Sequence, residues 1–136
     1  MKDHVALLLK KDNMFLFIKR SKNKKTLPGI WAFPSGTVEI GENIYETAKR
    51  EADEELGIKI DVHKVLTVKE LNEFNVRLHF LICEIISGFP FIKDRNEIEE
   101  ISWMTFSQFF NKYNYEQIGH GLIFLRENPN IWQEYI

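Results

Sequence analysis

The alternation of apolar and polar residues predicts strands over much of the chain. Two apolar runs, "HVALLLKK" at 4–11 and "MFLFIKR" at 14–20, flank the turn residues "KDN" and predict a β-hairpin. β-Branched and apolar residues dominate again at 60–71, 75–86 and 97–106. The segment 75–86 alternates only partly, which is typical of a strand buried on both faces, so we expect it to be a central strand.

Between these strands the apolar period becomes helical. After Gly41 a helix is predicted with Asn43 as its N-cap and Gly57 at the position that ends it. A second helix is predicted in "SQFFNKY", with Ser107 as N-cap, and a third at 116–128, stopped before Pro129. Strands on both sides of one strong helix predict an α/β protein with a mixed sheet covered by helices on its faces.

The first helix carries an unusual group of carboxylates. At about 100° per residue, one apolar stripe forms, with members Ile44, Tyr45, Ala48, Ala52 and Leu56. Glu51, Glu54 and Glu55 share one edge of the helix, and Arg50 is the only nearby cation, four residues before Glu54. Like charges at this spacing repel, and unpaired carboxylates beside a core are costly. A hard divalent cation such as Mg²⁺ or Mn²⁺ relieves both costs; an acidic surface helix is the alternative.

Length and composition restrict the class of protein. The 136 residues, 44% of them hydrophobic, suit a single domain spanning 1–136. The net charge of −2 argues against a binder of nucleic acid polymers, because such proteins usually carry a basic patch. The apolar stretch near the N-terminus is too short for a signal peptide, and no segment approaches the roughly 20 apolar residues that span a membrane. A cytoplasmic location is expected, and a homodimer is left open.

One segment resembles the complete signature of a known family. Residues 36–58, "GTVEIGENIYETAKREADEELGI", resemble a Nudix box, the motif of the Nudix hydrolases. The nine fixed places of that pattern are filled by Gly36, Glu42, Arg50, Glu51, Ala52, Glu54, Glu55, Gly57 and Ile58. The flanking segments "LFIKRS", "LPGIWAFPSG" and "EIEEISW" are also similar to the family, so the resemblance covers most of the chain.

The resemblance implies an α/β/α sandwich around a mixed sheet, and hydrolysis of a nucleoside diphosphate linked to another group. It implies that Glu54 and Glu55 ligate a divalent metal, with Glu51 as a further ligand or general base. The carbonyl of Gly36 is implied as another ligand. Some members take a further ligand from outside the box. Glu97, Glu99 and Glu100 are candidates here, with Glu97 preferred and Glu100 next, and a charged strand edge is the alternative for all three.

Two other box residues have supporting roles by the same resemblance: Arg50 orients the glutamates, and Glu42 supports the site. The chemistry suits these parts. A bound metal neutralises the diphosphate, polarises phosphorus and lowers the pKa of an attacking water, and a carboxylate held nearby can accept the proton. All the box glutamates are kept, which favours an enzyme over a catalytically silent domain that only binds a nucleotide or a protein.

Substrate choice depends on residues outside the box. The ADP-ribose branch often has a proline about fifteen residues past the box; this chain has none between Pro34 and Pro90. The diadenosine polyphosphate branch often has a tyrosine there, and none lies between Tyr45 and Tyr113. By elimination we expect a nucleoside triphosphate, canonical or oxidised, cut to monophosphate and pyrophosphate. Coenzyme A, a nucleotide sugar and a dinucleotide remain alternatives.

Candidate substrate contacts also lie outside the box. Arg20 and Arg77 are candidates to bind phosphates, with a solvated strand end as the alternative. Four aromatic residues are candidates to stack on a base, although core packing is the more frequent role of such residues: Trp31, Phe33, Phe74 and Trp103.

Overall fold

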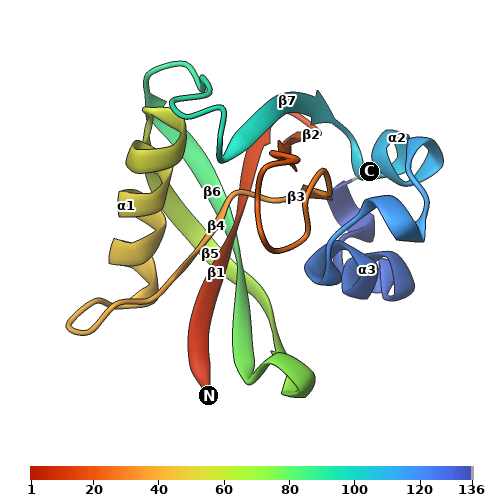
Figure 1. The fold of residues 1–136 in the computed structure, drawn as a ribbon, viewed down its shortest axis with the longest axis horizontal. Helices are drawn as coiled ribbons and strands as arrows, with labels where there is room; N and C mark the ends of the chain where they lie inside the picture. Colours follow the sequence, from red (N-terminus) through yellow and green to blue (C-terminus); the bar gives the residue numbers. More distant parts are fainter. Residues whose placement is uncertain (136) are drawn as a thin grey trace.

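A mixed sheet forms the centre of the molecule in a computed structural model that describes residues 1–135 (Figure 1). Within these residues the strand order is β3-β2-β1-β6-β5, with β4 paired to β1 and β7 to β2. The strands are β1 (Lys2–Lys11), β2 (Met14–Arg20), β3 (Trp31–Ala32), β4 (Ser35–Thr37), β5 (Lys59–Leu71), β6 (Val76–Ser87) and β7 (Ile98–Met104). The helices are α1 (Ile44–Leu56), α2 (Phe106–Lys112) and α3 (His120–Glu127).

Strand β1 joins the two halves of the sheet. It runs parallel to β6 from the pair Lys2↔Val76 to the pair Leu9↔Cys83. It then turns away and pairs with β2 through its last two residues, as the predicted hairpin requires. Because β6 lies between β1 and β5, the prediction that it is a central strand is confirmed.

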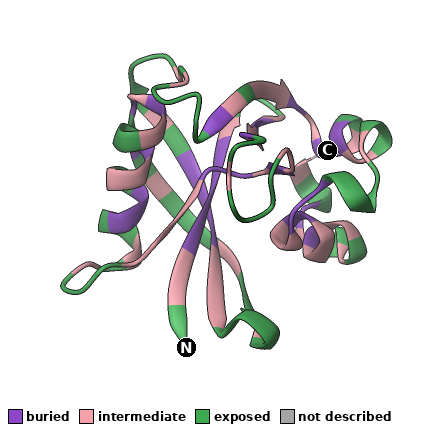
Figure 2. Cartoon of the chain, in the orientation of Figure 1, coloured by how far each residue is buried: buried purple, intermediate pink, exposed green. Residues whose placement is uncertain are grey.

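Helices cover both faces of the sheet, as expected for an α/β fold. In Figure 1, α1 lies on one side of the strands, and α2 and α3 lie on the other. Alternate residues of β1 supply the two cores: Val5 and Leu7 face the aliphatic core under α1, while Ala6 and Leu8 face an aromatic core under α2 and α3. The buried stripe of α1 faces the strands in Figure 2.

The ends of α1 agree with the sequence, but its buried face differs at one position. Asn43 accepts a hydrogen bond from the Glu46 backbone, and Gly57 ends the helix in the left-handed region at φ 66°. Tyr45, expected in the apolar stripe, is 46% exposed, so that expectation was wrong. Thr47 is buried instead, and its hydroxyl tolerates burial because two acceptors lie within reach of its proton, the Glu42 carboxylate at 2.9 Å and the Asn43 carbonyl at 3.0 Å.

The second helix begins earlier than predicted. Thr105, not Ser107, is the N-cap of α2. The Thr105 hydroxyl accepts from the Gln108 backbone at 3.1 Å, and the Gln108 side chain accepts from the Thr105 backbone at 2.9 Å. This capping box needs a Gln or Glu three residues after the cap, and Phe110 stands there for Ser107.

The last predicted helix is shorter than 116–128. Residues Tyr115–Gln117 form a separate 3₁₀ turn, and α3 starts only at His120, with Gly119 as N-cap. Asn114 caps the turn through its side chain, which accepts from the Glu116 backbone. The local cap therefore interrupts the helical pattern.

Candidate active site

Arg50 is the centre of an ion-pair network between α1 and the loop that follows β4. Its guanidinium donates twice to the Glu42 carboxylate, at 2.7 and 3.0 Å. It also donates to Glu51 at 2.9 Å, to Glu54 at 3.2 Å and to the Thr37 carbonyl at 3.1 Å. These bonds lower the pKa of Glu42 to about 2 and raise that of Arg50. The structure thus brings Glu42, Glu51 and Glu54 into contact with one guanidinium, whereas the sequence showed only their spacing along the chain.

Gly36, on β4, lies directly against the side chain of Glu51. A Cβ atom built at Gly36 would stand only 2.2 to 2.4 Å from carboxylate and methylene atoms of Glu51. The absent side chain is therefore what lets Glu51 approach the β4 backbone. Burial there raises the pKa of Glu51, against the opposing charge of Arg50.

Glu55 is the glutamate of the box whose pKa is raised furthest. Its Oε2 atom is buried and has no hydrogen-bond partner among residues 1–135. Burial, followed by repulsion from Glu51 and Glu97, raises the pKa of Glu55 to about 8, while the charges of Lys24 and Arg20 oppose the rise. A buried carboxylate oxygen without a partner requires a proton or a cation.

Glu97, the predicted ligand outside the box, is held by Lys24, a cation of the lysine-rich loop between β2 and β3 (residues 21–30). Its carboxylate forms an ion pair with Lys24, and its backbone carbonyl accepts from the Ser21 backbone at 3.0 Å. Glu99, one of its rivals, accepts instead from the Lys22 backbone at 3.0 Å and anchors the loop. Lys24 was missed from sequence, because nothing distinguishes it from the other lysines of the basic loop.

The oxygen donors suit a hard divalent cation in type, but they are not gathered around one point. Among residues 1–135, no three acidic, histidine or cysteine side chains are arranged to hold a metal ion. Arg50 holds Glu51 and Glu54, and Lys24 holds Glu97. The unpartnered oxygen of Glu55 nevertheless fits a metal, because a cation there would satisfy it. These side chains would have to exchange their present cations for the metal.

A cavity of about 530 Å³ lies near the box, between the sheet and α3. Ser35, next to Gly36, lines it, as does Phe74, whose ring lies 4.5 Å from that of His120. Arg20 also lines it and holds the loop between β2 and β3 in place, since its guanidinium donates to the carbonyls of Thr26 and Leu27. The remaining walls are largely apolar, formed by Leu71, Val76, Leu78 and Leu122 among others.

The predicted substrate contacts divide between this cavity and other places. Arg20, Phe33 and Phe74 line it. Trp31 is only 3% exposed and packs in the aromatic core, 5.0 Å from Tyr113, so its ring offers no face to a base. Arg77 pairs with Asp3 at 3.3 Å and does not line the cavity. The wall residue His120 was missed, because its partner ring lies almost fifty residues away in the sequence.

An α/β fold with a glutamate-rich helix beside its sheet is the arrangement of one protein family, and comparison with known proteins identifies that family. A family model described as "NUDIX domain" matches residues 2–123. The chain therefore belongs to the Nudix family, as the resemblance of its box predicted. No helix in the described part of the chain is long and apolar enough to cross a membrane.

Individual relatives agree with this assignment. Nudix hydrolase 6 of Arabidopsis thaliana is 35% identical over an alignment of 88 residues that covers 62% of this chain and only 31% of that protein. Nucleoside triphosphatase NudI of Salmonella arizonae is 28% identical over 116 residues, covering 77% of this chain and 82% of that protein. The crystal structure of MutT NUDIX hydrolase from Burkholderia pseudomallei shares the fold at 21% identity and a TM-score of 0.72, covering 93% of this chain and 95% of that one.

Proposed function

We propose that the protein is a divalent-metal-dependent pyrophosphohydrolase that cuts a nucleoside triphosphate to monophosphate and pyrophosphate. The observation that carries this proposal is the buried Glu55 oxygen without a partner, set among further carboxylates of α1. A site built only for stability would pair such an oxygen with a donor from the protein. A site that must accept a cation leaves such an oxygen without a donor from the protein.

The residues that would hold the metal are those of the box edge. We assign the carboxylates of Glu54 and Glu55 and the carbonyl of Gly36 as ligands of Mg²⁺ or Mn²⁺, with Glu51 as a further ligand or as the general base. Glu97 would be a further ligand once Lys24 releases it. When bound, the metal supplies charge neutralisation of the diphosphate, polarisation of phosphorus and activation of water.

The chain's own groups would position the reaction and move its proton. Burial makes Glu51 a stronger base than a solvated glutamate, because it raises the pKa of the carboxyl group. Arg50 donates to Oε1 of Glu51, which leaves Oε2 to accept the proton of the attacking water. Arg50 in turn is fixed by Glu42, so the base is held in one orientation.

The neighbouring cavity supports a nucleoside as the group that is recognised. Its volume of about 530 Å³ is sufficient for a base and ribose, and its walls offer a partly exposed ring at Phe74. Lys24 and Glu97 line a shallow pocket together. Once Lys24 is released from the Glu97 carboxylate, its ammonium group would meet the phosphate chain of the substrate. The relative NudI, named a nucleoside triphosphatase, supports the same substrate class.

The test is pyrophosphate release from nucleoside triphosphates in the presence of Mg²⁺. Glu55→Gln and Glu54→Gln should each lose activity by at least about a hundredfold while the fold is retained, since each change removes a metal-ligand charge. Asp53→Asn is the matched control, because Asp53 is an exposed acid on the same helix outside the Arg50 network. Full activity in both glutamine variants would refute the assignment of the metal site.

A substrate panel separates the alternatives. Canonical and oxidised nucleotides, ADP-ribose, coenzyme A, nucleotide sugars and dinucleoside polyphosphates should be compared at equal concentration. Preference for a triphosphate supports the proposal, and preference for another diphosphate would replace its substrate while keeping its chemistry. Binding of nucleotide with no turnover of any compound would instead indicate a silent domain.

A further inference from the structure

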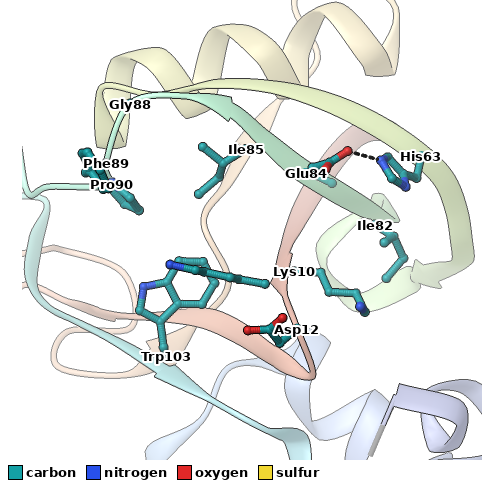
Figure 3. A pocket seen from close by; sticks show the side chains of 12 residues that line it. Lys10, Asp12, His63, Ile82, Glu84, Ile85, Gly88, Phe89, Pro90 and Trp103 are labelled. Atoms are coloured by element: carbon teal, nitrogen blue, oxygen red, sulfur yellow. Dashed lines mark hydrogen bonds and ion pairs between the residues drawn. The ribbon is translucent and has the colours of Figure 1, made fainter.

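A second cavity, of about 490 Å³, opens where the sheet divides at the carboxyl end of β1 (Figure 3). The last pair between β1 and β6 is Leu9↔Cys83, and the next residues of β1 pair with β2 instead. Beyond Cys83, therefore, no strand within residues 1–135 pairs with the β1 side of β6, and the space between the halves of the sheet stays open. This cavity shares no lining residue with the cavity beside the Nudix box.

One wall of this cavity is apolar and aromatic. Trp103 of β7 forms it together with Phe89 and Pro90 from the loop after β6. The other two tryptophans pack against aromatic rings, but Trp103 has no aromatic partner in the described part of the chain. Phe89 is 87% exposed, so the wall presents ring faces that the protein itself does not cover.

The opposite wall carries charge. Lys10, His63 and Glu84 lie across from Trp103 in Figure 3, and Lys11 also lines the cavity. The Glu84 carboxylate accepts a hydrogen bond from the His63 ring at 2.8 Å, which becomes an ion pair when His63 is protonated. Neither lysine forms an ion pair within residues 1–135, and the lining holds two carboxylates, Asp12 and the His63-bound Glu84. The ammonium groups of Lys10 and Lys11 are therefore free to meet an anion in this cavity.

We propose that this cavity is a second ligand site, which binds a planar aromatic anion. The ring would lie against Trp103 and Pro90, and the carboxylate, sulfonate or phosphate group would meet Lys10 and Lys11. The volume matches that of small-molecule sites, which are typically about 300 to 1,000 Å³. Binding is non-covalent, because burial raises the pKa of the lining thiol, Cys83, to about 12 and leaves it unreactive. The site does not depend on the proposed hydrolase activity.

The loop that lines this cavity is also attached to the helix of the Nudix box. The Phe91 backbone donates to the Leu56 carbonyl at 3.2 Å, and the Lys93 ammonium donates to the Asp53 carbonyl at 3.3 Å. The Phe91 ring also fills the space beside Gly57, where an added Cβ would stand 2.3 Å from it. An occupant that contacts this loop is therefore expected to disturb the carboxyl end of α1 as well.

The test is a titration of ¹⁵N-labelled protein with naphthalenesulfonate, followed by NMR. Trp103→Phe identifies the indole N–H signal of Trp103 among the three tryptophan signals. Two further probes separate the chemistry: naphthalenemethanol supplies the ring without charge, and methanesulfonate supplies the charge without a ring. We expect naphthalenesulfonate alone to shift the Trp103 signal strongly, with a smaller shift at Gly57. Lys10→Met should weaken binding about threefold to tenfold, and the loop variant Lys22→Met should not.

Three results would overturn the proposal. The uncharged ring could bind as tightly as the anion, or Lys10→Met could bind as tightly as the unmodified protein; either would remove the role of the lysines. Shifts at Phe74 and His120 without a shift at Trp103 would place the probe in the other cavity. Because Lys10→Met changes a partly exposed side chain, it is expected to fold, and its thermal unfolding checks this.

Discussion

Replacing Glu55 by glutamine should change how the stability of the metal-free protein depends on pH. The folded-state pKa of about 8 lies above the ordinary value of 4.5, so the folded protein holds this proton more tightly than the unfolded chain. Stability from this group is fully present below about pH 4.5 and is lost as the pH rises toward about 8. The loss reflects the growing cost of a charged, buried and unpartnered carboxylate.

The size of the effect follows from the two pKa values. At 1.36 kcal/mol per pKa unit, Glu55 should cost on the order of 3 kcal/mol of unfolding free energy between about pH 5 and about pH 8. Glutamine does not ionise, so Glu55→Gln should lack this part of the pH dependence. Any cost of burying the amide is the same at every pH, and it therefore shifts the profile without tilting it.

Urea unfolding in the presence of a chelator measures the difference at several pH values. The gap between Glu55→Gln and the unmodified protein should move in favour of the variant as the pH rises. Added Mg²⁺ should then stabilise the unmodified protein more than the variant, because metal binding to the folded state alone raises stability. Parallel profiles for the two proteins, with Asp53→Asn as control, would refute the assignment of a raised pKa to Glu55.

Three further predictions concern other parts of the site. Gly36→Ala should displace Glu51, lower the free energy of unfolding by roughly 1–3 kcal/mol and weaken Mn²⁺ binding in calorimetry, because the added Cβ would stand 2.2 Å from that side chain. Lys24→Met should tighten Mn²⁺ binding and raise the KM for a triphosphate, whereas Lys22→Met should change neither; equal effects of both would contradict the position assigned to Lys24. Phe74→Ala should raise KM roughly tenfold with little change in kcat, since base stacking is worth about 1–3 kcal/mol; an unchanged KM would place the base elsewhere.

The sequence determined what depends on near neighbours in the chain. The helical period and the caps at Asn43 and Gly57 fixed α1, because each of these signals acts within a few residues. The same spacing placed Glu51, Glu54 and Glu55 along one edge of that helix, and hence made a family resemblance visible. Where local signals competed, as at the start of α2, the wrong cap was predicted because two hydroxyl residues stand close together.

Only the tertiary structure decided which distant residues meet. Lys24 and Glu97 are joined because β2 and β7 are paired, which brings their adjoining loops together. The packing of the strands and α3 likewise places the Phe74 ring beside that of His120. The same packing buries Trp31 in the aromatic core and leaves Trp103 lining a second cavity. The composition of the chain does not predict whether a given aromatic ring packs in the core or lines a binding site. That choice depends on which face of the sheet the ring occupies and on what lies opposite it.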